Sequence, residues 1–280
     1  MFYRSVKFLL ESFQSYLLVL ASFLLGKSRF FPLSPPFFKD QFFFDKKNKK
    51  FFYIKIRDWS DFYVIRELFY KHELNLSFLR RYKDIDNFYK NNKKLLILDL
   101  GGNIGLSAKY FSLTWKKTKI LSIEPEINNL ILAKKNNFGN KNIKTLNGAV
   151  GPKNSKGFVF HPKEGEEFKG NGAFRVDLIN KIKIKKNKKN INFYSIKNIL
   201  LKFRNHKPFI LKIDIEGFEE SLFKFNTEWV RKFPVIIIEL HDYIFPRLGN
   251  SRNFLKTIAK ENVDFIIVKN HVVIVSNTLL

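Results

Sequence analysis

Lysine, carboxylate and imidazole side chains gather at the ends of two apolar segments of the sequence. Lys212, Asp214 and Glu216 alternate at the end of the first segment, and Glu239 and His241 end the second. Because side chains in a strand point alternately to its two faces, the first three share one side. Burying such groups is costly unless they are paired or functional. We therefore predict that these five residues are catalytic, with a structural ion-pair network as the alternative.

A glycine-rich turn at residues 99–105 follows an earlier apolar segment. Its glycines allow the backbone to turn sharply and to approach a ligand closely. The carboxylate of Asp99 would repel a pyrophosphate, but it suits a ligand that carries sulfonium and ammonium groups. The candidate cofactor-binding residues of this turn are Asp99, Gly101, Gly102, Asn103 and Gly105.

Two further positions extend this candidate cofactor site. Glu124 ends the next apolar segment, where an acid can accept hydrogen bonds from both hydroxyls of a ribose. Ala149 lies in a run of small residues, 147–151, which suits a backbone that closes over an adenine ring. Together with the glycine turn, these residues favour S-adenosylmethionine over NAD.

Strand and helix patterns alternate along the part of the chain that carries these residues. The expected strands are 95–100, 119–124, 143–147, 209–215, 235–240, 265–269 and 272–276, and the expected helices are 104–115, 126–137 and 253–260. Alternation at this spacing predicts an α/β fold with a mostly parallel sheet and helices on both faces. A tight turn at Asn270 and His271 joins the last two strands, so we expect one antiparallel edge strand.

Four motifs together resemble the FkbM family of S-adenosylmethionine-dependent methyltransferases, over roughly residues 52 to 276. They are Asp99-Leu100-Gly101-Gly102-Asn103-Ile104-Gly105, Ile123-Glu124-Pro125, Leu211-Lys212-Ile213-Asp214-Ile215-Glu216-Gly217 and Ile238-Glu239-Leu240-His241. Upstream, residues 57–61, which include Asp61, resemble the helix that caps the family's cofactor pocket. The chain departs from the family at Gly102, where Ala is usual, and at residues 193–197, where a Thr-Leu-Asp-like segment is usual.

This resemblance implies a seven-stranded Rossmann-like sheet, the class I methyltransferase fold, and methyl transfer to oxygen. The family's acceptors are hydroxyls of sugars in glycans, of glycolipids or of secondary metabolites. His241 is the leading candidate for the general base, because imidazole titrates near neutral pH, and Asp214 is the second candidate. A divalent metal held by Asp214, Glu216, Glu239 or His241 is an alternative way to activate the hydroxyl, although the chemistry does not require one.

Residues 1–50 are expected to form an apolar helix and a lead-in rich in Pro and Lys. The methyltransferase domain then covers 51–280, with a cap at 51–94 and a Rossmann-like core at 95–280. The prolines at 32, 35 and 36 should end the first helix. Strands should follow at 41–44 and 51–56, and Ser60 should cap the next helix.

The longest uncharged run of the first helix, 12–26, is shorter than the ~20 residues that a spanning helix needs. A helix packed on the domain or on a partner, an interfacial helix and a signal peptide are the alternatives for this segment. We expect a cytoplasmic protein, with peripheral membrane contact through residues 1–31 as one of these alternatives.

The composition is strongly basic, with 51 Lys and Arg against 25 Asp and Glu and a formal net charge of +26. Lys far outnumbers Arg, and the joint excess of Lys, Asn, Ile and Phe is typical of an AT-rich genome, so the charge says little about function. The absence of Cys excludes disulfide scaffolds, Cys-ligated metals and thiolate chemistry. Two other functions remain as alternatives: a nucleic-acid methyltransferase and a non-catalytic, membrane-associated binding protein. The Lys-rich stretch 181–190 is expected to be a solvated loop.

Overall fold

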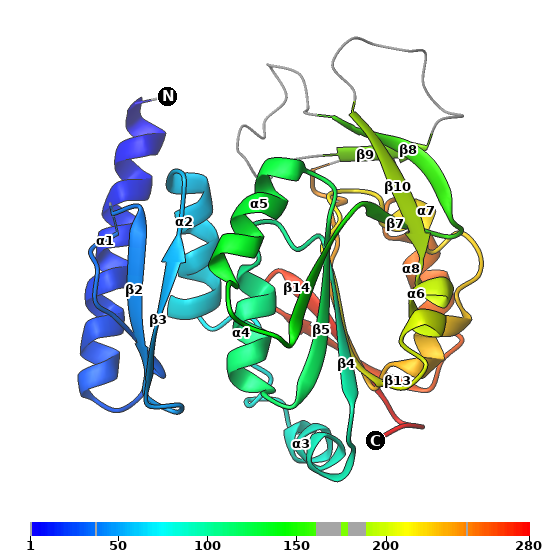
Figure 1. Cartoon of the computed structure of the whole chain (residues 1–280), viewed down its shortest axis with the longest axis horizontal. Coiled ribbons are helices and arrows are strands. Elements are labelled where there is room, and N and C mark those ends of the chain that lie inside the picture. Colours follow the sequence, from blue (N-terminus) through cyan, green and yellow to red (C-terminus); the bar gives the residue numbers. More distant parts are fainter. Residues whose placement is uncertain (1, 37, 161–174, 179–188, 245) are drawn as a thin grey trace.

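A seven-stranded sheet forms the centre of the molecule (Figure 1). The computed structural model describes residues 2–36, 38–160, 175–178, 189–244 and 246–280. In spatial order, the strands of the sheet are β13 (Val263–Val268), β14 (His271–Ser276), β12 (Val235–Glu239), β11 (Lys207–Ile213), β4 (Leu95–Leu100), β5 (Thr118–Glu124) and β6 (Ile143–Asn147).

Both faces of this sheet are covered by helices, and the sequence of β4 shows why. Leu95 and Ile97 pack into one core cluster, while Leu96, Leu98 and Leu100 pack into another on the opposite face. The first cluster includes side chains from α3 (Tyr82–Asn91), α4 (Leu106–Thr114) and α5 (Ile127–Asn136). The second includes side chains from α6 (Ile196–Lys202), α7 (Glu219–Leu222), η3 (Glu228–Lys232) and α8 (Arg252–Ile258). The predicted α/β class and the two helical layers are therefore confirmed.

The sequence analysis predicted an antiparallel strand at the edge of the sheet, but the antiparallel strand is the second from the edge. β14 pairs antiparallel with both β12 and β13, and β13 is the edge strand. After β12 the chain passes through α8 to the edge, and a two-residue loop between Val268 and His271 returns it into the space beside β12. The other neighbouring strands of the sheet pair in parallel.

The N-terminal segment differs from its prediction in two places. Helix α1 (Phe2–Leu24) ends well before Pro32, because Gly26 adopts a left-handed backbone with φ of 75° and stops it. The chain then forms β1 (Phe30–Pro32), β2 (Asp40–Asp45) and β3 (Lys50–Lys55), an antiparallel sheet of which the first strand was not predicted. None of the helices within the described residues is long and apolar enough to cross a bilayer.

Asp58, not Ser60, caps the following helix. Its carboxylate accepts hydrogen bonds from the backbone N–H groups of Ser60 and Asp61, which opens α2 (Trp59–Ile65). The helix continues as the π-helix η1 (Arg66–Tyr70). The aromatic side chains of Phe30 and Phe69 then join the N-terminal sheet and η1 to the same core cluster.

A second sheet lies between β6 and β11 in the sequence, where the sequence analysis predicted no strand. Its order is β7 (Ala149–Gly151), β10 (Lys189–Ser195), β8 (Ser155–Phe160) and β9 (Arg175–Leu178). Most of the Lys-rich stretch 181–190 lies outside the described residues, but Lys189 and Asn190 begin β10. The strand leads directly into α6, whose first turn is capped by the Ser195 hydroxyl.

Candidate active site

A cavity of about 560 Å³ opens at the carboxyl ends of β4, β11 and β12. The glycine turn forms its floor, α2 and η1 form one wall, and the start of β14 closes the far side. A smaller recess of about 50 Å³ lies between the glycine turn, the end of β5 and β7. Gly101, Asn103, Asp214 and Glu216 line both spaces, so the recess and the cavity meet at these residues.

The backbone of the glycine turn is fixed by its neighbours. The N–H groups of Gly101 and Gly102 both donate to the carbonyl of Ile123 at the end of β5. Gly101 has a φ of 76°, and a Cβ there would lie 1.7 Å from the backbone carbonyl oxygen of Asp214. Only glycine therefore allows the turn to pass this close to the end of β11.

Gly102 lies directly against the side chain of Ser122, which leaves no room for a larger residue at position 102. A Cβ at Gly102 would lie 1.9 Å from the Ser122 hydroxyl oxygen, and that hydroxyl donates to Asp99 at 2.8 Å. The hydroxyl of Ser122 occupies the space that a methyl group at position 102 would need. This contact explains why position 102 is glycine here, although alanine is usual in the family that the motifs resemble.

Asp99 lies beneath the turn and lines neither space among the described residues. Its fully buried carboxylate accepts hydrogen bonds from the hydroxyls of Ser107 and Ser122, and Lys212 Nζ lies 3.6 Å away. The structure therefore places Asp99 as a support of the turn and of Lys212. The sequence analysis had placed it against the ligand itself.

Glu124 lines the recess beside Ala149, on the strand end that the sequence indicated. Its Oε2 accepts from the backbone N–H of Asn103 at 2.8 Å, and its Oε1 accepts from Glu126 N–H and the Asn129 side chain. Burial raises the pKa of Glu124 to about 7, against these hydrogen bonds. The glycine turn and the end of β5 are thus joined through one carboxylate.

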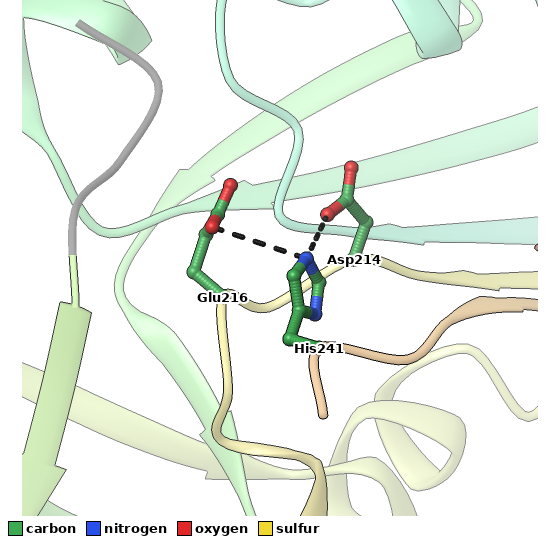
Figure 2. Close-up of side chains that lie close together, drawn as sticks. All are labelled: Asp214, Glu216 and His241. Carbon is green, nitrogen blue, oxygen red and sulfur yellow. Dashed lines mark ion pairs between the residues drawn. The ribbon is translucent and has the colours of Figure 1, made fainter. Parts of the chain in front are cut away.

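His241 is the centre of the charged cluster (Figure 2). Its Nε2 lies 3.6 Å from Asp214 Oδ1 and 3.9 Å from Glu216 Oε2, and its Nδ1 lies 2.8 Å from Glu219 Oε1. Lys212 Nζ donates to the Gly101 carbonyl and to Asp214. Four of the five predicted catalytic residues are therefore brought together at the meeting point of cavity and recess.

The charged groups of this cluster shift one another's pKa values. Burial alone would lower the pKa of His241, but Glu219, Asp214 and Glu216 outweigh it and raise the pKa to about 10. Burial and the charge of Asp214 raise the pKa of Glu216 to about 8. Burial would also raise the pKa of Asp214, yet Lys212 and His241 hold it below its usual value. At neutral pH, these shifts favour an imidazolium at His241, an ionised Asp214 and a protonated Glu216.

Glu239, the fifth predicted residue, faces a different part of the cavity. His271 Nε2 lies 3.8 Å from its carboxylate, and Tyr243 donates to it at 3.4 Å. Glu73 lies 3.6 Å from the other nitrogen of His271. Burial and the charge of Asp214 raise the pKa of Glu239 to about 7. These residues form a second acidic wall, which the sequence analysis did not identify.

Sequence reasoning also missed Glu219. It is fully buried and opens α7, and its carboxylate accepts from the Gly217 backbone N–H as well as pairing with His241. An acid in the first turn of a helix is usually explained by the helix dipole, so its position gave no separate signal.

Asp61 is buried away from the cavity. Its carboxylate accepts from the Arg57 guanidinium at 2.8 and 2.9 Å and from the Arg57 backbone N–H. It does not line either space among the described residues, whereas its helix neighbours Trp59, Ser60 and Tyr63 line the larger one. Asp61 thus fixes the start of α2, and α2 supplies the wall.

Three residues of the cluster offer ligand atoms of the kind that divalent cations bind. One atom from each of Asp214, Glu216 and His241 lies within 4.8 Å of the others. Two carboxylates and an imidazole suit such an ion. Glu239 is not part of this group among the described residues, because its carboxylate faces His271.

Comparison with known proteins gives one family match. Residues 99–267, more than half of the chain, match the methyltransferase FkbM domain, whereas no curated protein is significantly similar in sequence. Among solved structures, the METTL16 methyltransferase domain is 10% identical, with a TM-score of 0.37 over 71% of this chain and 66% of that one. M. capricolum TrmK, in complex with S-adenosyl-homocysteine, is 13% identical, with a TM-score of 0.33 over 69% and 68%. Precorrin-6y C5,15-methyltransferase from Geobacter metallireducens is 11% identical, with a TM-score of 0.34 over 71% and 89%.

Proposed function

The chain belongs to the FkbM family of S-adenosylmethionine-dependent methyltransferases, and from this premise we propose that it methylates a hydroxyl oxygen of a sugar, glycolipid or secondary metabolite. The observation that carries the proposal is the meeting of two spaces at Asp214 and Glu216. A cofactor in the recess and an acceptor in the cavity would face each other there. Bound S-adenosylmethionine supplies an electrophilic methyl group at that point.

The recess has the groups that an adenosine moiety needs. Glu124 Oε2 accepts one hydrogen bond within the protein and keeps capacity for a ribose hydroxyl. Gly148 and Ala149 form a wall of small residues, and Ile123 and Phe218 add apolar surface for the base. Ionised Asp214 supplies negative charge where the sulfonium would lie, and the positive charge of the sulfonium would favour ionisation of Glu216 beside it.

The walls of the larger cavity favour a polyhydroxylated acceptor. Trp59, Tyr63 and Tyr243 contribute aromatic surface, and Glu73 and Glu239 contribute carboxylates. Carboxylate oxygens accept hydrogen bonds and a protonated carboxyl also donates one, so both groups pair well with hydroxyl groups. In their ionised form the same groups would repel a phosphate backbone, which argues against the nucleic-acid alternative.

His241 is the proposed base. Glu219 holds its Nδ1, so its Nε2 points to the meeting point of cavity and recess. The pKa of His241 falls when a cation binds against Asp214 and Glu216, because like charges disfavour the protonated form. Neutral His241 then accepts the hydroxyl proton at Nε2 as the new C–O bond forms and the C–S bond breaks.

Metal activation is the alternative mechanism, and the grouping of Asp214, Glu216 and His241 supports it. An ion held by these residues would acidify the hydroxyl as a Lewis acid. A chelator would then silence the enzyme, and Asp214→Asn would remove both activity and the dependence on divalent ions.

Mass spectrometry of glycans and lipids from cells with and without the gene tests the proposal. A methyl ether that depends on the gene, and that the purified enzyme restores with S-adenosylmethionine, is the expected result. In the restored reaction, His241→Ala should lower the rate by about 10²–10⁴-fold. The matched control is His206→Ala, just before β11 and so at the opposite end of that strand. Methylated nucleosides or methylated amines in place of an ether would contradict the proposal.

A further inference from the structure

Helix α1 exposes an apolar face to solvent. The side opposite to this face carries the buried Ser12 and Val19 and packs on β1 and η1. Between 47% and 81% of each exposed side chain is accessible at Leu10, Phe13, Leu17 and Leu24. Their spacing of three, four and seven residues places them in one stripe along the helix.

The hairpin of β2 and β3 exposes a second apolar face. Phe42 pairs with Tyr53 across the two strands, and Phe44 pairs with Phe51. Phe42, Tyr53 and Phe51 are 50%, 44% and 73% exposed. The packing of the three-stranded sheet does not explain large aromatic side chains on its outer face.

The two faces are connected through a row of rings. Phe23 near the end of α1 lies 4.5 Å from Phe31 of β1, and Phe31 is paired in register with Phe44 of β2. We call the exposed residues on both sides of this row the N-terminal apolar surface. It consists of Leu10, Phe13, Leu17, Leu24, Leu25, Phe42, Phe51 and Tyr53.

Lysines gather at one end of this surface. Lys27 follows α1, and four exposed lysines crowd the β2–β3 turn: Lys46, Lys47, Lys49 and Lys50. The acid of that turn, Asp45, is fully buried and paired with Arg29, so it does not offset them. An apolar patch with a cluster of lysines at one end matches the acyl and headgroup layers of an anionic bilayer.

We propose that the N-terminal apolar surface docks the protein on the face of an anionic lipid membrane, with α1 lying in the interface. A dimer through the same surface would join two copies that each carry a net charge of +26, which opposes their association. The docking surface extends beyond α1 to the hairpin, and β3 leads into α2, the wall of the larger cavity. In Figure 1 these elements lie together at one end of the molecule.

Co-sedimentation with vesicles tests the proposal and does not depend on catalysis. The full chain should sediment with vesicles of phosphatidylcholine and phosphatidylglycerol and less with phosphatidylcholine alone, and high salt or carbonate should release it. The variants Leu24→Gln and Phe51→Gln should each weaken binding by about tenfold, from the lost apolar burial. Their matched control is Leu201→Gln, a leucine 62% exposed on α6 across the molecule, which should bind normally.

Three outcomes would overturn this inference. One is binding to neither vesicle, and another is binding that survives carbonate and yields only to detergent. The third is a concentration-dependent dimer in light scattering that Leu24→Gln and Phe51→Gln convert to monomer, since a second copy would then cover the surface.

Discussion

The substitution Glu219→Gln tests how the structure prepares His241 for proton transfer. The Glu219 carboxylate is fully buried and lies 2.8 Å from His241 Nδ1. Glutamine keeps the volume and an oxygen acceptor but removes the negative charge. A hydrogen bond to a charged group contributes about 1.5–3 kcal/mol, and a tenfold change in proton affinity is worth about 1.4 kcal/mol. We therefore expect the pKa of His241 to fall by about 1–2 pH units from its value of about 10.

Carbon-13 NMR of histidine-labelled protein measures this change without any acceptor substrate. The chain has 5 histidines, and His241→Asn identifies the resonance of interest by its loss. His206 is the internal control, because burial and the charges of Lys119 and Lys94 lower its pKa and Glu219 plays no part. The reasoning is refuted if His241 titrates near 6.5 in the parent protein, or at the same pH in parent and variant.

The charged site should also make folding stability fall as pH rises. The folded pKa of Glu216, about 8, exceeds its usual value of 4.5, so its contribution to stability is present below pH 4.5 and is lost as pH rises through 8. His241 acts with the same sign, and its contribution is lost as pH rises through 10. Thermal unfolding should show that Glu216→Gln flattens the slope between pH 5 and 8, and an unchanged slope would contradict the assigned pKa. Gly102→Ala should destabilise the protein by about 1–3 kcal/mol in urea unfolding, because its methyl group would overlap the Ser122 hydroxyl. Adding Ser122→Ala should recover part of this loss, and strictly additive effects would show that the two positions are not coupled.

The central sheet could be predicted because its strands follow simple rules. β4 is apolar at five of six positions, and its odd and even residues pack on opposite faces. Such an apolar segment, followed by a glycine turn and a helix, has few possible structures other than a buried parallel strand. The place of β14 could not be predicted in this way, because a hairpin pattern fixes that two strands pair but not which of them enters the sheet.

The candidate site was predictable where local periodicity decides it. Lys212, Asp214 and Glu216 alternate on one strand, so their shared side follows from the sequence. Glu219 comes to His241 only because the chain turns back into α7, and this turn has no periodic signal. The burial of Asp99 beneath the glycine turn could not be predicted either, because the serine hydroxyls that hold it there come from two other elements.

Calorimetric titration with S-adenosylhomocysteine tests the central claim most directly, because it requires no knowledge of the acceptor. We expect one molecule to bind per chain and Glu124→Ala to weaken binding by about 1–3 kcal/mol, as a lost charge-assisted hydrogen bond would. NAD should give no heat. Tight binding of NAD with no response to S-adenosylhomocysteine would contradict the account.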